Sequence, residues 1–163
     1  EESQGYLSGL TTVYSKLGHV PDIVRLCAAV QLKHGTDKYW KPRGGISPEE
    51  KLVIKQLLLE TIPHEQSGPV AAQAALICSK IVRKDGNGSW GELFICIGRT
   101  VASVECNIKS KSFCALTLKE LVKMMKSKRL PADRKQFRKL SADLWPVAGE
   151  LYQSAQQRLI VSF

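Results

Sequence analysis

Residues 24–40 read VRLCAAVQLKHGTDKYW, and residues 71–90 read AAQAALICSKIVRKDGNGSW. Both stretches contain alanine-rich sequence that favours a helix, continue through lysines to an aspartate, and close on a tryptophan. Trp40 and Trp90 are 50 positions apart (90 − 40), and Trp145 follows 55 positions later (145 − 90). A pattern that returns at this spacing predicts a repeat of two helices, in which small residues let neighbouring helices pack closely.

Helical spacing of apolar residues continues on both sides of these stretches, and no strand-like alternation persists. Turn signals separate the segments: Gly18, the loop at 41–45, the Asp-Gly-Asn-Gly run at 85–88, and Leu130-Pro131. Ser47 before Pro48, with two glutamates following, is a strong helix start. We expect about seven helices, over residues 6–17, 22–33, 47–61, 66–84, 89–104, 111–128 and 132–159.

The pairing of these helices predicts the fold class. We expect an all-α protein, a HEAT or armadillo-type α-α superhelix (solenoid) of about three to four helix pairs. The predicted helix Ser47–Thr61 supports stacking, because Leu52 and Leu59 lie away from the stripe of Ile54 and Leu58. A helix that is apolar on two sides has neighbours on both, or a partner protein on one. An irregular helical bundle remains the alternative.

The charge of the chain is concentrated in one segment. The 163 residues contain 24 Lys plus Arg and 15 Asp plus Glu, for a net charge of +9. Residues 119–139 hold nine of the basic residues and two acidic ones, which is +7. This patch is compatible with a solvated helix face, an acidic protein partner or nucleic acid; we do not expect nucleic acid, because only Phe137 is interleaved as an aromatic. Its candidate residues are Lys123, Lys126, Lys128, Arg129, Arg134, Lys135 and Arg138.

The sequence contains no recognisable catalytic or metal-binding motif. The three histidines lack zinc spacing to each other or to cysteine, and no phosphate-binding glycine loop or nucleophile elbow occurs. We therefore expect no enzyme activity, no cofactor and no metal. The five cysteines include no Cys-x-x-Cys pair and are expected to be reduced thiols of an intracellular protein. The apolar runs are too short for membrane insertion.

The stretch 24–40 resembles the N-terminal signature of the importin-β (karyopherin) superfamily, and Lys33-His34-Gly35 with Asp37-Lys38-Tyr39-Trp40 looks closest to its importin eleven branch. The alanine-rich helix that ends at Asp85 and the Trp90-Gly91-Glu92-Leu93 run are similar to later motifs of that family. We expect the signature residues to be architectural; they are Arg25, Lys33, Asp37, Trp40, Asp85 and Trp90.

The resemblance implies that residues 1–163 are the N-terminal HEAT-repeat region of a longer nuclear transport receptor. Residues 6–40 would hold the remainder of the first repeat and the second A helix, 47–105 the next repeats, and 110–163 the last helix pair. Such receptors bind the small GTPase Ran in its GTP form, carry import cargo proteins, contact phenylalanine-glycine nucleoporins, and shuttle between cytoplasm and nucleus. The competing hypothesis is a HEAT scaffold outside transport that binds an acidic protein, or nucleic acid, through Lys119–Lys139.

In this family the B helix of each two-helix repeat faces Ran. Residues 47–61 and 90–104 are expected to be B helices, so the side chains that point away from their core stripe are the candidate Ran contacts. These candidates are Glu49, Leu52, Gln56, Leu59 and Arg99.

Overall fold

The computed structural model describes residues 5–41, 45–85 and 90–126, together with scattered positions between 135 and 157. Within the three continuous ranges every regular element is a helix. The elements are α1 (Tyr6–Ser15), α2 (Asp22–Tyr39), α3 (Pro48–Thr61), the 3-10 helix η1 (Ile62–His64), α4 (Gly68–Asp85), α5 (Gly91–Ala102) and α6 (Ile108–Lys126).

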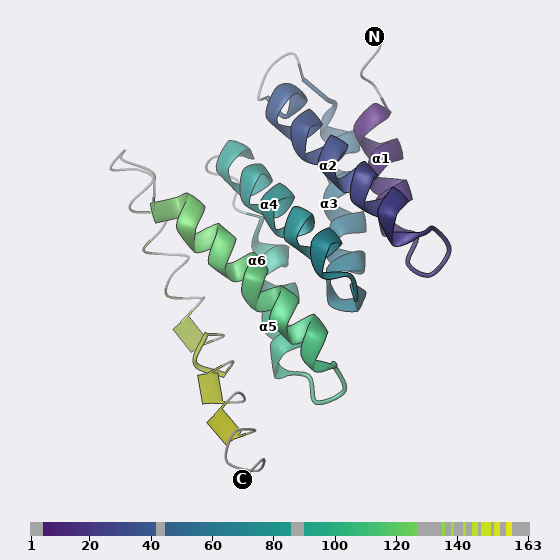
Figure 1. Ribbon diagram of the computed structural model, residues 1–163. Coiled ribbons are helices and arrows are strands. Elements are labelled where there is room, and N and C mark those ends of the chain that lie inside the picture. Colours follow the sequence, from purple (N-terminus) through teal and green to yellow (C-terminus); the bar gives the residue numbers. More distant parts are fainter. Residues whose placement is uncertain are drawn as a thin grey trace.

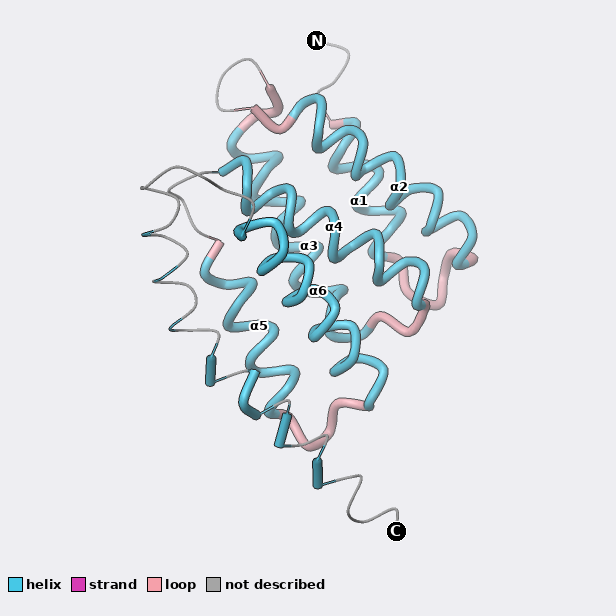
Figure 2. Tube along the Cα trace, turned by 60° about the vertical axis from the view of Figure 1, so that its left-hand side comes forward, coloured by secondary structure: helices cyan, strands magenta, loops and turns pink. Residues whose placement is uncertain are grey.

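The helices form two layers. Helices α2, α4 and α6 lie side by side in one layer, which we call the A layer, and α1, α3 and α5 lie behind them in the B layer (Figure 1). Successive helices alternate between the layers, and the stack advances from the N-terminus toward the C-terminus (Figure 2). Because each helix pair buries its apolar side against the next pair, the chain is an all-α HEAT-type solenoid. The predicted fold class is confirmed.

The core lies between the two layers and is mostly aliphatic, with the aromatic side chains of Tyr14, Trp40, Trp90 and Phe94 among its members. Small residues let the helices approach closely: Ala29, Ala74 and Ala75 are buried in α2 and α4. Gly35 is needed for the same reason, since a Cβ atom there would lie 2.3 Å from Leu7 Cδ2 of α1. The fully buried large side chains include Leu7, Tyr14, Leu32, Ile54, Leu58, Ile77, Ile81, Leu93, Ile97 and Leu121.

Helix boundaries agree with the sequence where a local signal sets them. Ser47 Oγ accepts a hydrogen bond from the Glu50 N–H at 3.1 Å, and Gly18 adopts φ 72° after α1. Most of the other predicted boundaries differ from the structure by one or two residues, and two were wrong by three or more. Helix α2 continues past Lys33 to Tyr39, and α6 begins at Ile108 rather than Lys111 because Asn107 Oδ1 accepts a hydrogen bond from the Ser110 N–H. The helix predicted over 132–159 lies mostly outside the described residues.

The first helix receives its N-terminal cap from another helix. Gly5, at the N-cap of α1, has no side chain to accept a hydrogen bond. The buried carboxylate of Glu50 in α3 accepts instead, from the Gly5 N–H at 3.2 Å and the Ser8 N–H at 3.1 Å. A carboxylate at this end also interacts favourably with the helix dipole. Glu50 thus sets the register of α1 against α3.

Candidate functional site

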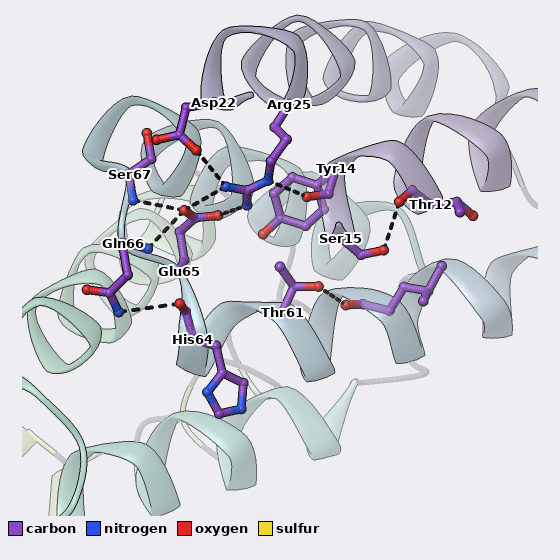
Figure 3. A network of polar contacts seen from close by, with 11 residues as sticks. Thr12, Tyr14, Ser15, Asp22, Arg25, Thr61, His64, Glu65, Gln66 and Ser67 are labelled. Atoms are coloured by element: carbon purple, nitrogen blue, oxygen red, sulfur yellow. Dashed lines mark hydrogen bonds and ion pairs between the residues drawn. The ribbon is translucent and has the colours of Figure 1, made fainter. Parts of the chain in front are cut away.

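Arg25 is the centre of a buried polar network that joins three parts of the solenoid (Figure 3). Its side chain is only 2% exposed, and it is held by three partners. Nε donates to the Tyr14 carbonyl of α1 at 2.9 Å, and Nη1 donates to Asp22 Oδ1 at 3.0 Å and to Glu65 Oε1 at 3.3 Å. Nη2 forms a second, charge-assisted contact with Glu65. The network fixes the end of α1 and the start of α2 against the connection before α4.

Glu65 is the partner that sequence patterns did not reveal. It is buried, it lies 40 residues from Arg25, and it also accepts hydrogen bonds from the N–H groups of Gln66 and Ser67. Burial opposes the charge of Arg25, but the hydrogen bond and the negative charge of Glu65 raise the pKa of the guanidinium. A buried charge pair of this kind is stable only because every charged atom has a partner.

Trp40 and Trp90 cover the end of the repeats where α2 and α4 finish and α3 and α5 begin. Both rings are buried, and Trp40 Nε1 donates to Asp85 Oδ1 at 2.6 Å. Lys55 of α3 pairs with the same carboxylate and places its ammonium 5.7 Å from the Trp90 ring centroid. Lys51 lies over Trp40 in the same way, at 5.5 Å. The two tryptophans are therefore joined through Asp85 and Lys55.

The remaining signature residues hold α2 against α4. Lys33 Nζ donates to Gln73 Oε1 at 2.8 Å, and Asp37 forms an ion pair with Lys80. Lys84 donates to the carbonyl of Thr36 at 3.0 Å, near the C-terminus of α2. All six signature residues thus make contacts between elements, although Asp37 is exposed at the surface.

The exposed side of the B layer contains the predicted partner contacts. Glu49, Leu52 and Gln56 lie on one face of α3, and Leu52 is 67% exposed. Gln56 Nε2 donates to Glu60 Oε1 at 3.0 Å on the same face. Two hydrogen bonds at the start of α3, from the backbone of Glu49 and from Ser47, lower the pKa of the Glu49 carboxyl. An exposed leucine beside these polar side chains is suited to protein contact rather than to catalysis.

Helix α5 continues this face. Arg99 is exposed, and Glu92 and Ile95 share its side of the helix. Ile95 is 55% exposed and was not identified from the sequence, although its spacing of four residues from Arg99 could have indicated it. We call the exposed side chains of α3 and α5 the B-layer face: Glu49, Leu52, Val53, Gln56, Glu60, Glu92, Ile95 and Arg99.

Leu59 differs from the other candidate contacts. It is partly buried and packs against the core, and Cys96 Sγ lies 3.5 Å from its carbonyl oxygen. The expectation that its side chain points fully away from the core was therefore wrong. The reason is tertiary: the last turns of α3 lie against α5, which covers positions that the helical wheel places on the free side.

The predicted basic patch is described only in part. Lys123 is exposed in α6, with Nζ 4.0 Å from Glu120 Oε2, and Lys135 and Arg138 are exposed positions with helical backbone. The side chain of Lys126 and the residues Lys128, Arg129 and Arg134 lie outside the described part of the chain.

The described residues contain no group of three or more His, Cys, Asp or Glu side chains that could hold a metal ion. No described helix is long and apolar enough to cross a membrane. Cys78 and Cys114 are buried thiols, and burial raises the pKa of both, that of Cys114 to about 12. Cys27 is exposed, contrary to its apolar sequence neighbourhood.

Comparisons with known proteins agree with this geometry. Residues 1–64 match the family described as importin-beta N-terminal domain. The chain is 33% identical over 156 residues to a mouse protein named importin-11 and 32% identical to its human counterpart, across 93% of this chain and 15% of each relative. A yeast protein named importin beta-like protein KAP120 is 33% identical over 96 residues, 58% of this chain and 9% of the relative.

The chain therefore spans about 15% of the length of the importin-11 relatives it matches. No solved structure gives a significant match. The family match covers α1 to η1, and the similarity to importin-11 continues through the later helices. From the repeat architecture, the signature contacts and these matches, the chain resembles the N-terminal region of importin-β superfamily proteins, and over most of its length it is similar to the importin-11 type.

Proposed function

We propose that this chain is the N-terminal part of a nuclear transport receptor and that it binds the small GTPase Ran in its GTP form. The observation that carries the proposal is the B-layer face, where two well-exposed aliphatic side chains, Leu52 and Ile95, stand among charged ones. Apolar anchors with a polar surround are the usual composition of a protein-binding surface.

The charges of the B-layer face favour a basic partner. Glu49, Glu60 and Glu92 contribute three negative charges and Arg99 one positive charge, so the face is acidic although the chain as a whole is basic. A surface of this sign attracts the basic region of a partner and orients it before contact. Lys119 and Lys123, the basic residues of segment 119–139 whose side chains are described in α6, lie in the A layer instead.

Ran binding would serve a transport cycle. We propose that the full receptor carries a cargo protein into the nucleus, contacts phenylalanine-glycine nucleoporins on the way, and releases the cargo when Ran-GTP binds. The coupling is reciprocal, because a cargo that weakens Ran binding is itself weakened by Ran to the same extent. The proposal includes shuttling between cytoplasm and nucleus and no enzymatic step in this region.

Titration of the chain with Ran loaded with GTP or with GDP tests this function. The expected result is binding of the GTP form that is at least about tenfold tighter than binding of the GDP form. Equal affinity for the two nucleotide states would contradict the proposal. A longer version of the receptor that contains the chain is titrated in parallel, and absence of binding by both would contradict it as well.

A further inference from the structure

Three helices of the A layer carry a lysine at matching positions. Lys38 lies near the end of α2, Lys80 lies 42 residues later in α4 (80 − 38), and Lys123 lies 43 residues later in α6 (123 − 80). Side-chain contacts between neighbouring A helices have offsets of 40 to 48 residues, which include that of the lysines. Asp37 and Lys80 are 43 residues apart, and Arg83 Nη1 reaches Met124 Sδ, 41 residues away, at 3.3 Å. Residues about 42 apart therefore lie next to each other, so these lysines form a row across three parallel helices.

Further cations widen the row. Arg83 and Lys119 are exposed on α4 and α6, and we call these five side chains the outer basic row: Lys38, Lys80, Arg83, Lys119 and Lys123. Two carboxylates lie among them, Asp37 beside Lys80 and Glu120 beside Lys123. The row with these two acids carries +3, from five cations and two anions.

The charges around Lys84 show that the electrostatic environment beside the outer basic row is positive. Lys84 lies one residue beyond Arg83, and its pKa is lowered by burial first and then, against the raising effect of Asp37, by the charges of Lys80, Lys41 and Arg83. Like charges are thus held close together at this end of the A layer. Clustered like charges repel one another in the folded chain. A surface that carries them attracts an anionic partner.

We propose that the outer basic row binds an extended acidic segment of a partner polypeptide, at a surface separate from the B-layer face. Neighbouring packed helices are about 8–10 Å apart, and an extended chain advances about 3.3 Å per residue. Every third residue of an extended peptide that crosses the A helices therefore meets one lysine of the row. A segment with Asp or Glu at that spacing matches Lys38, Lys80 and Lys123 in turn.

The chemistry of the row favours carboxylates over nucleic acid. Four of its five cations are lysines, which attract carboxylate and phosphate alike as point charges, so the preference rests on what surrounds the row. The centroid of the Tyr39 ring lies 4.8 Å from Lys38 Nζ, but one ring does not provide the series of aromatic side chains on which successive bases stack. The opposite charges of the two layers also direct an acidic segment to the A layer, because Glu49, Glu60 and Glu92 on the B-layer face repel it.

The test uses a fluorescein-labelled peptide about 12 residues long, with Glu at every third position among Gly and Ser, titrated against the chain. The variant Lys38→Gln/Lys119→Gln/Lys123→Gln removes three charges from the row. The control Lys16→Gln/Lys109→Gln/Lys111→Gln removes three charges elsewhere, Lys109 and Lys111 being in the first turn of α6. Circular dichroism confirms that both variants keep their helices.

We expect the row variant to bind the peptide about tenfold more weakly, since each exposed ion pair contributes modestly and three are lost. The control should change affinity less than about threefold. Equal weakening in both variants, no binding by the unmodified chain, or tighter binding of a single-stranded oligonucleotide of equal charge would each overturn the proposal. None of these outcomes depends on Ran, so failure here is separable from failure of the transport function.

Discussion

The indole Nε1 of Trp40 donates a hydrogen bond to Asp85 Oδ1 across 2.6 Å, which joins two residues 45 positions apart in the sequence. Each lies at the end of an A-layer helix, α2 and α4. Asp85 also pairs with Lys55, whose ammonium lies over Trp90. This arrangement explains why an aspartate and a tryptophan recur together in the two stretches of sequence that define the repeat.

Replacing Asp85 by Asn should therefore destabilise the chain by about 1–3 kcal/mol, because the charge-assisted hydrogen bond to Trp40 and the pair with Lys55 are both weakened. Urea denaturation followed by circular dichroism measures the change in unfolding free energy. Asp37→Asn is the matched control, since its partner Lys80 is on the surface and such pairs contribute about 0–1 kcal/mol. Equal losses in the two variants would contradict the role assigned to Asp85.

The Arg25–Glu65 pair predicts a non-additive pattern. Either Arg25→Met or Glu65→Gln alone leaves a buried charge without its partner and should cost about 3–5 kcal/mol. The double variant Arg25→Met/Glu65→Gln should be clearly more stable than the sum of the single losses predicts, because no unpaired charge remains. Thermal and urea unfolding of all three variants test this. Simple additivity would show that the two side chains stabilise the fold independently.

Two adjacent glutamates of α3 should behave differently. Glu50→Ala removes the cap on α1 and should cost about 1 kcal/mol, with faster hydrogen exchange at the amides of Gly5 and Ser8. Glu49→Ala removes an exposed carboxylate from the same turn and should leave exchange in α1 unchanged. If Glu49→Ala accelerated exchange in α1 as much as Glu50→Ala, the cap would not be the cause.

Leu52 and Ile23 provide a matched pair for partner binding, since they are 67% and 65% exposed but lie in different layers. Leu52→Asp on the B-layer face should weaken binding of Ran-GTP at least about tenfold, because it places a charge at a central apolar contact. Ile23→Asp, in the A layer, should leave that affinity within about twofold. Isothermal titration calorimetry gives both constants, and a larger effect at Ile23 would move the binding surface to the other layer.

The cysteines should react with iodoacetamide in an order set by burial. Cys27 is exposed and should be alkylated first at pH 8, whereas Cys78 and Cys114 should react only on unfolding. The low reactivity expected of Cys114 follows from its pKa. Burial raises the pKa of Cys114 to about 12, so at pH 8 this thiol is protonated and not nucleophilic. Mass spectrometry of peptides after timed alkylation checks the order. Early labelling of Cys114 in the native chain would contradict the packing of α6 against α4.

The class of the fold and most of its helices follow from local features of the amino-acid sequence. Apolar spacing, Ser47 before Pro48, Gly18 after the first helix, and the recurrence of alanine-rich helices that end in Asp and Trp all act locally or at a fixed period. Such signals can be read without coordinates. The exposure of Leu52 could be predicted in the same way, because the helical wheel alone places it away from Ile54 and Leu58.

Which distant side chains contact each other depends on how the helices pack. Glu65 pairs with Arg25, Glu50 caps α1, and Leu59 is partly covered by its neighbours. Each of these contacts depends on how one element packs against another. The row of Lys38, Lys80 and Lys123 is of the same kind: its members are more than 40 residues apart, and packing of parallel helices brings them together. Local pattern cannot encode such contacts, because a side chain's burial and its charged neighbours are properties of the assembled layers.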